Sequence, residues 1–193
     1  MERKGLDISS YQKGINFDEI KSKVDFLILR AGFTGWGGDG TNKNKDSCFE
    51  DFYSKSKARG IPVGAYWYSC ANTYEKGKAE AEYLYNNCLK GKQFEYPIYM
   101  DVEEDRHQQV GKSRMADAIK GFCEYLENKG YYVGIYANSN YFNNFIDTAK
   151  LSMYDKWLAV WTSNKPSFKY GDYGLWQNSS SGYISGMRVD TDY

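Results

Sequence analysis

The segment Phe26-Leu27-Ile28-Leu29-Arg30-Ala31 begins with four consecutive apolar side chains. A strand with one face in water would alternate apolar and polar side chains instead. A continuous apolar run is typical of a strand in a parallel sheet, because helices cover such a sheet and bury both of its faces. Seven other short segments are interpreted as strands: Gly5–Ile8, Pro62–Tyr66, Ile98–Val102, Tyr132–Tyr136, Trp157–Val160, Gly174–Trp176 and Gly186–Asp190.

Helical patterns separate the early strands. The clearest covers Ser113–Lys129, where Ser113 is the expected N-cap and Gly130 the expected stop. Its apolar stripe consists of Met115, Ile119, Phe122 and Leu126. The other predicted helices are Asp46–Arg59, Tyr74–Leu89, and shorter ones near Phe17 and Ser139.

Eight strands with about five helices predict an α/β fold, an irregular (β/α) barrel without its late helices. A complete barrel of this TIM-like type usually needs about 250 residues, and this chain has 193. We therefore expect a single compact domain over residues 1–193. The glycine-rich stretch Thr34–Lys45, which contains Trp36, is expected to be a long loop on the rim.

The composition narrows the classes of function. The formal net charge is zero, from 25 basic and 25 acidic residues, which argues against a nucleic-acid partner. The chain is polar, with a mean hydropathy of −0.71, yet aromatic residues make up 18% of it. Tyr and Trp in such a chain either stack on sugar rings or build a Tyr-rich core, and composition alone leaves both open.

The sequence shows no membrane or export signal. No apolar run approaches the roughly 18 residues of a membrane helix, and the segment Met1–Asp7 lacks the apolar stretch of a signal peptide. We expect synthesis in the cytoplasm and no insertion into a membrane. The four widely spaced cysteines are expected to be free thiols; they are Cys48, Cys70, Cys88 and Cys123.

A single histidine, His107, limits the chemistry. Zinc hydrolases usually need two or three histidine ligands, and a nucleophilic triad would depend on His107 alone. No calcium-binding Asp-x-Asp-x-Asp-Gly loop is present either. We expect neither metal nor cofactor, and hydrolytic chemistry that depends on carboxylates.

Carboxylates follow three of the predicted strands. Asp101 and Glu103 are two residues apart, so both side chains should point to the same side of their strand. Two carboxylates that share one space raise the pKa of one of them, which suits a proton donor for glycosidic cleavage. Glu103 is the expected donor, and Asp101 is expected to carry the negative charge. The alternative is that Glu103–Arg106 is an ordinary solvated acidic loop.

The order of motifs resembles the family 25 glycoside hydrolases, the 1,4-β-N-acetylmuramidases or lysozymes that are common in phage endolysins. The resemblance covers essentially the whole chain. It rests on Gly5–Gln12, Phe26–Gly32, the pair Asp46 and Phe49, Gly60–Tyr66, Asp101-Val102-Glu103, Trp157–Ala159, Leu175–Gln177 and Val189–Asp192. The family pattern often has His-Phe where this chain has Trp67-Tyr68, and Asn where it has Asp192.

The resemblance implies cleavage of the β-1,4 bond between N-acetylmuramic acid and N-acetylglucosamine in bacterial peptidoglycan, with net retention. It implies four acidic site residues, which are Asp7, Asp101, Glu103 and Asp190. Glu103 corresponds to the proton donor. Asp101 corresponds to the residue that assists the substrate's acetamido group or acts as the nucleophile. A wall-binding module beyond residue 193 is a further hypothesis. The rival functions are a non-catalytic glycan-binding barrel and a wall amidase or peptidase.

Several residues near the strand ends are candidates for contacts with the glycan. Each aromatic one is equally compatible with a core position. Asp192 could instead face outward into solvent, and Arg30 could pair with Asp7 or Asp101 or form an ion pair elsewhere. The candidate substrate-binding residues are Tyr66, Tyr68, Tyr136, Trp176 and Asp192.

Overall fold

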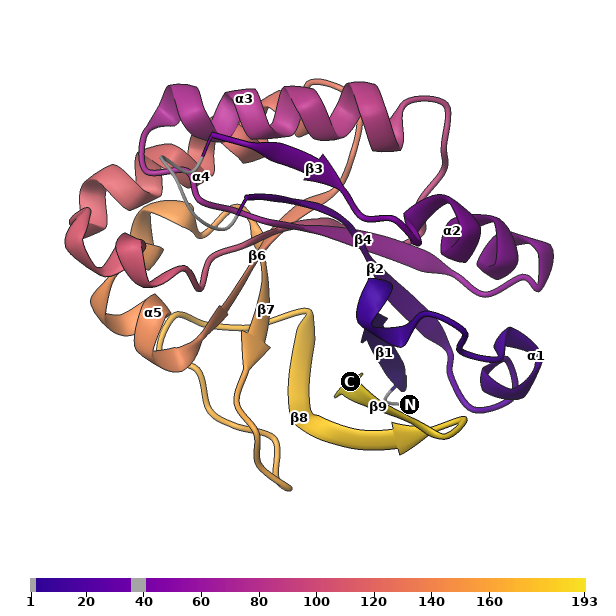
Figure 1. Ribbon diagram of the computed structural model, residues 1–193. Coiled ribbons are helices and arrows are strands. Elements are labelled where there is room, and N and C mark those ends of the chain that lie inside the picture. The colour runs from indigo at the N-terminus through magenta and orange to yellow at the C-terminus, as the bar shows by residue number, and fades with distance from the viewer. Residues whose placement is uncertain (1–2, 36–40) are drawn as a thin grey trace.

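The computed structural model describes residues 3–35 and 41–193, and shows a closed barrel with helices on its outside (Figure 1). The eight-stranded α/β barrel with five helices confirms the predicted fold class. Its first and second strands pair with each other, which closes the sheet. The barrel strands are β1 (Gly5–Ile8), β2 (Phe26–Thr34), β4 (Val63–Tyr68), β5 (Ile98–Asp101), β6 (Val133–Asn138), β7 (Asp155–Ala159), β8 (Leu175–Ile184) and β9 (Met187–Asp192).

The last strand departs from the expected parallel arrangement. Strand β9 runs antiparallel to both β8 and β1. Its hairpin with β8 turns at Ser185 and Gly186, which both have positive φ, as in the tight turns that favour two-residue hairpins. The carboxyl end of β9 therefore lies beside the amino end of β1.

The predicted rim loop is partly a strand. Strand β3 (Lys43–Lys45) pairs antiparallel with the end of β2, so this segment forms a hairpin on the edge of the barrel. The loop's centre, including Trp36, lies outside the described residues.

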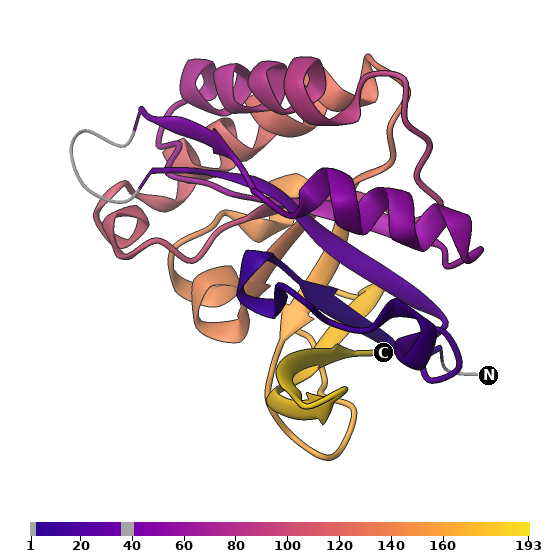
Figure 2. The same ribbon diagram turned by 45° about the vertical axis from the view of Figure 1, so that its right-hand side comes forward.

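Five α-helices connect the strands within the described part of the chain. Figures 1 and 2 show α3 (Tyr74–Leu84) and α4 (Lys112–Glu127) together on the side of the barrel away from the β8–β9 hairpin. Helix α4 begins at Lys112 after Gly111, which makes no side-chain cap, so the predicted cap at Ser113 was wrong. The π-helical turn Tyr85–Leu89 continues α3 to the predicted end. The helices are α1 (Phe17–Ile20), α2 (Phe49–Ala58), α3 (Tyr74–Leu84), α4 (Lys112–Glu127) and α5 (Ser139–Asn144).

The two faces of the strands bury different side chains. On β2, Leu27 and Leu29 pack in the layer between strands and helices, whereas Phe26 and Ile28 belong to the barrel interior. That interior is strongly aromatic, with Tyr99 and Trp157 both nearly or fully buried. The four cysteines are buried and free, as predicted. No helix within residues 3–35 and 41–193 is long and apolar enough to span a membrane.

Candidate active site

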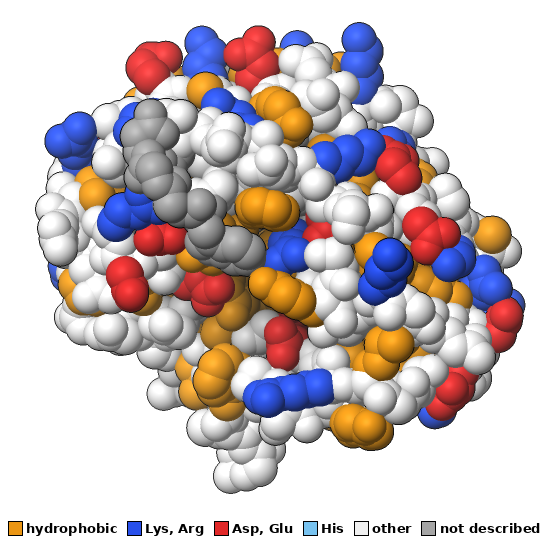
Figure 3. All heavy atoms as spheres, viewed as in Figure 1, with side chains coloured by type: hydrophobic (Ala, Val, Ile, Leu, Met, Phe, Trp, Pro, Cys, Tyr) orange, Lys and Arg blue, Asp and Glu red, His pale blue; other side chains and the backbone are white. Residues whose placement is uncertain are grey.

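A small cavity of about 70 Å³ lies at the carboxyl ends of the parallel strands. The four acids named from the sequence all line it, which confirms that they come together. Figure 3 shows acidic side chains beside a hollow near the centre of this face, with hydrophobic side chains along its edges. The cavity is lined by Asp7, Tyr66, Asp101, Glu103, Tyr136, Trp157, Gln177 and Asp190.

Three strands position these acids. Asp101 is the last residue of β5, and Glu103 follows it by two residues, so both side chains reach the same cavity. Asp190 lies directly opposite Asp7 in the antiparallel pairing of β9 with β1. The backbone at Glu103 is held from α5, because the Tyr141 hydroxyl donates a hydrogen bond of 2.9 Å to the Glu103 carbonyl oxygen.

The acids lie at different depths. Asp7 is 6% exposed and Asp101 is 4% exposed, so both form the floor of the cavity. Glu103 lies at the rim with part of the residue exposed, although its carboxyl group is largely enclosed, and Asp190 is half-buried. One oxygen of the Asp101 carboxyl, Oδ1, is buried without a hydrogen-bond partner among the described residues. A donor supplied by a substrate could satisfy that oxygen.

Burial and mutual repulsion raise the pKa values of Asp101 and Glu103. Burial, followed by the charges of Glu103 and Asp7, raises the pKa of Asp101 well above its usual value. Burial, followed by the charges of Asp190 and Glu104, raises the pKa of Glu103. A carboxyl that keeps its proton toward neutral pH is suited to general acid catalysis. The raised pKa of Asp101 favours its protonated form, which differs from the charge that the sequence analysis expected on it.

A polar network behind the acids was missed by the sequence analysis. Gln177 Nε2 donates to Asp7 Oδ2 at 2.8 Å, which fixes the Asp7 carboxylate. Gln177 Oε1 accepts from the Tyr136 hydroxyl at 2.9 Å and from Trp161 Nε1 at 3.1 Å. The alternation of side chains along β8 was the available signal, because Gln177 must face the opposite side from Trp176.

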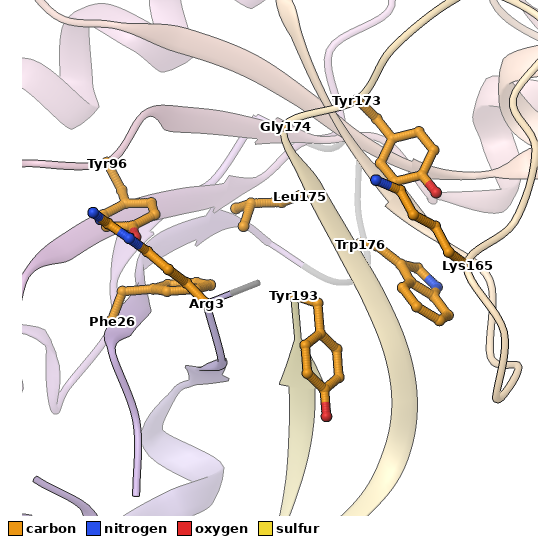
Figure 4. Close-up of a pocket in the computed structure, with 9 residues that line it drawn as sticks. All are labelled: Arg3, Phe26, Tyr96, Lys165, Tyr173, Gly174, Leu175, Trp176 and Tyr193. Carbon is orange, nitrogen blue, oxygen red and sulfur yellow. The ribbon is translucent and has the colours of Figure 1, made fainter. Parts of the chain in front are cut away.

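The aromatic candidates separate into two groups. Tyr66 and Tyr136 line the cavity, as the sequence suggested. Tyr68 does not line it; its hydroxyl donates to Glu104 Oε2 at 2.9 Å on the neighbouring wall. Trp176 faces a different pocket of about 280 Å³, shared with Arg3 and Tyr96 (Figure 4).

That second pocket is at the opposite end of the barrel. Phe26 and Leu175, which line it, are the first residues of β2 and β8. Trp176 is 7% exposed and its Nε1 donates to the Val160 carbonyl oxygen at 2.7 Å. From this position Trp176 does not reach the acidic cavity, so the predicted contact of Trp176 with a glycan bound there does not fit the structure.

Arg30 and Asp192 occupy buried positions that the sequence did not settle. Arg30 pairs with Asp46, Nε to Oδ2 at 2.7 Å, and not with Asp7 or Asp101. Its charge nevertheless acts to lower the pKa of Asp101. Asp192 is 0% exposed, so the solvent-facing alternative was wrong, and a direct contact with substrate does not fit either. The cause is the antiparallel β9, which carries Asp192 from the rim into the barrel.

A sequence profile of the Glycosyl hydrolases family 25 matches residues 6–187. The chain belongs to this family. As a family 25 domain it is a glycosidase, and its acidic cavity lies where a (β/α) barrel carries its active site.

Known proteins extend the comparison. The chain is 28% identical to the autolytic lysozyme of Clostridium acetobutylicum over 192 residues, which are 98% of this chain and 54% of that protein. The chain thus spans about half the length of this curated relative. The crystal structure of the CTP1L endolysin has a TM-score of 0.86 at 23% identity, covering 100% of this chain and 66% of that one.

A further solved structure is the modular autolysin LytC of Streptococcus pneumoniae in complex with a synthetic peptidoglycan ligand. It has a TM-score of 0.81 at 22% identity, covering 98% of this chain and 46% of that one. At this level of identity, the two structural matches establish the fold.

Proposed function

We propose that this chain is the catalytic domain of a peptidoglycan muramidase that cleaves the β-1,4 bond between N-acetylmuramic acid and N-acetylglucosamine and so lyses bacterial walls. The observation that carries the proposal is the cavity with Asp101 on its floor and Glu103 at its rim, in a family 25 chain. The name of the autolytic lysozyme and the peptidoglycan ligand of the LytC complex are consistent with this substrate.

In the proposed mechanism, Glu103 donates its proton to the glycosidic oxygen as the bond to the anomeric carbon breaks. Its raised pKa supports this role, because the carboxyl group keeps its proton to higher pH than an ordinary glutamate does. The leaving sugar departs with a hydroxyl group. Glu103, now ionised, accepts a proton from the water that attacks the anomeric carbon in the second half of the reaction.

Asp101 supports the reacting centre from below. Its unpartnered Oδ1 is an acceptor suited to the N–H of the acetamido group on the sugar. That contact favours the ionised form of Asp101 and turns the acetamido oxygen toward the anomeric carbon. Attack by this oxygen, or by Asp101 itself, forms an intermediate that water then opens.

Both routes give net retention at the anomeric carbon. Residues two apart along an extended chain lie about 7 Å apart at Cα, with side chains that can converge. Such a close pair in a small cavity favours the retaining arrangement over the inverting one, which needs a wider gap for a water molecule. Proton NMR of the first sugar anomer released tests this step directly.

The decisive test of the proposed function is Glu103→Gln. We expect this variant to lose roughly a hundredfold to ten-thousandfold of its wall-clearing rate, because the amide has no proton to give, while its circular dichroism stays that of the wild type. The matched control is Glu127→Gln, at the other end of the barrel beside a separate pocket. Clearing by Glu103→Gln at the control rate would reject Glu103 as the donor. Binding of walls by the wild type without any cleavage would favour a glycan-binding module.

A further inference from the structure

Asp192 is a buried carboxyl group inside the barrel. It lies on β9 across from Gly5 of β1 and Gln177 of β8, and none of its surface is exposed. Its Oδ1 accepts a hydrogen bond of 2.9 Å from Trp157 Nε1. Its other oxygen, Oδ2, is buried and receives no hydrogen bond from any described residue. An ionised carboxylate in this position would leave a dry, charged oxygen without a donor, which is costly.

The neighbour that can satisfy this oxygen is another acid. Asp7 and Asp192 are diagonal neighbours on the same face of the β1–β9 pairing, because Asp190 lies opposite Asp7 and Asp192 lies opposite Gly5. Two ionised carboxylates cannot form a hydrogen bond, because both can only accept. A hydrogen bond between Asp192 and Asp7 therefore requires a proton on one of the two. Asp190 lies directly opposite Asp7, but Asp190 is half-buried and can be solvated by water.

No cation among the described residues pairs with Asp7 or Asp192. The titratable groups that act on Asp192 or are affected by it are Asp7 of β1, Asp190 of β9 and Tyr99 of β5. The Tyr99 hydroxyl is already committed, since it donates to Asp155 Oδ2 at 2.7 Å. Among the described residues, no Lys or Arg forms an ion pair with Asp7 or Asp192.

We infer that Asp7 and Asp192 share one proton inside the barrel, and that Asp192 is a positioning residue that holds Asp7 through it. With the proton in place, Gln177 and Asp192 bind the Asp7 carboxyl from two sides, beneath the catalytic pair. Loss of the proton would leave two repelling carboxylates in a dry space and would disturb the cavity floor. The consequence for catalysis rests on the proposed function, whereas the shared proton does not.

The direction of the pKa shifts agrees with a shared proton. Burial, together with the charge of Asp190, raises the pKa of Asp192 to about 8. Burial and the charges of Asp192 and Asp190 raise the pKa of Asp7 well above its usual value. The folded protein thus binds a proton that the unfolded chain releases near pH 4. Stability contributed by this proton is fully present at low pH and is lost as pH rises toward about 8.

The test is Asp192→Asn. The asparagine oxygen can still accept from Trp157, and its amide can donate permanently to Asp7, so the variant mimics the protonated pair. The ratio of the two unfolding equilibrium constants, wild type divided by Asp192→Asn, should increase about tenfold for each unit of rising pH between about pH 5 and pH 8, as expected for the release of one proton. Wall cleavage by the variant should extend to higher pH than that by the wild type.

Asp155→Asn is the matched control. Asp155 is another acid of the barrel strands, but its two oxygens already accept hydrogen bonds from Tyr99 and from the backbone N–H of Gly174. This variant should keep the wild-type pH dependence of stability. At neutral pH, the infrared difference spectrum of the wild type minus Asp192→Asn should also show a protonated carboxyl band, because the contributions of Asp101 and Glu103 are common to both proteins and cancel. Asp7→Asn should remove the same band, and it provides a second variant if Asp192→Asn does not fold.

Two results would overturn the inference. One is a pH dependence of unfolding in Asp192→Asn that parallels the wild type. The other is a neutral-pH infrared difference spectrum of the wild type minus Asp192→Asn without the band. Absence of wall cleavage by the wild type would instead reject the proposed function, and the stability and infrared results would still decide whether the proton is shared.

Discussion

Replacing Asp46 with alanine should lower the free energy of unfolding by about 4 kcal/mol, because this side chain is the only ion-pair partner that the structure describes for the buried Arg30. Its Oδ2 accepts from Arg30 Nε at 2.7 Å and from the Ser10 backbone N–H at 3.1 Å. Its Oδ1 accepts from the Cys48 backbone N–H at 2.8 Å. The Asp46 side chain has no exposed surface, and that of Arg30 is 8% exposed.

The magnitude follows from what alanine leaves behind. Removing one partner of a buried ion pair costs about 3–5 kcal/mol, since the remaining charge stays in a dry site. Two backbone N–H groups also lose their acceptor, although relaxation and water limit the added cost. With a urea slope of about 2 kcal/mol per M, the unfolding midpoint should fall by roughly 2 M.

The assay is urea unfolding followed by circular dichroism, with Asp18→Ala as the control. Asp18 makes the same kind of contact with Arg59, also at 2.7 Å, but its side chain is 77% exposed. Its loss should leave the midpoint nearly unchanged, because solvent screens an exposed pair. Adding Arg30→Met to Asp46→Ala should recover part of the loss. Equal midpoint shifts for Asp46→Ala and Asp18→Ala would refute this reasoning.

Three further predictions concern the site and the thiols. Tyr136→Phe removes the hydroxyl that donates to Gln177, so kcat should fall about fivefold, equivalent to about 1 kcal/mol, with the fold unchanged. Steady-state kinetics that match the wild type would contradict this prediction. Asp190→Asn removes a negative charge that raises the pKa of Glu103, so the alkaline limb of the pH profile of kcat/KM should move to lower pH. An alkaline limb that stays in place or moves to higher pH would count against Glu103 as the donor. Because all four cysteines are buried, a thiol reagent should react slowly with the native protein and titrate four groups after denaturation; rapid reaction of the native protein would contradict the burial.

The local elements of the fold were largely readable from the sequence. Strand β1 has the predicted bounds, and β2 is apolar on both faces because it packs against the barrel interior and the helices. The direction of β9 was missed, although Ser185-Gly186 is a dipeptide suited to a two-residue hairpin. A strand's pattern of side chains does not encode its direction; the connection to the preceding strand does.

The site was predictable as a set of acids but not as an arrangement. Asp101 and Glu103 could be paired from their spacing, and the resemblance to family 25 added Asp7 and Asp190. The burial of Asp192 depends on the direction of β9, which the sequence pattern does not encode. The placement of Trp176 away from the acidic cavity depends on which residues of β8 face the barrel interior. Gln177 has no chemical signature of its own, and only its contact with Asp7 shows its role.

The most direct test of the central claim is the chemical identity of the new chain ends. Purified walls would be digested with the protein, the reducing ends reduced with borohydride, and the fragments analysed by mass spectrometry. A muramidase that uses Glu103 as donor leaves N-acetylmuramic acid at every new reducing end, and none appear with Glu103→Gln. New ends that carry N-acetylglucosamine, or new free amines without new reducing ends, would contradict the account.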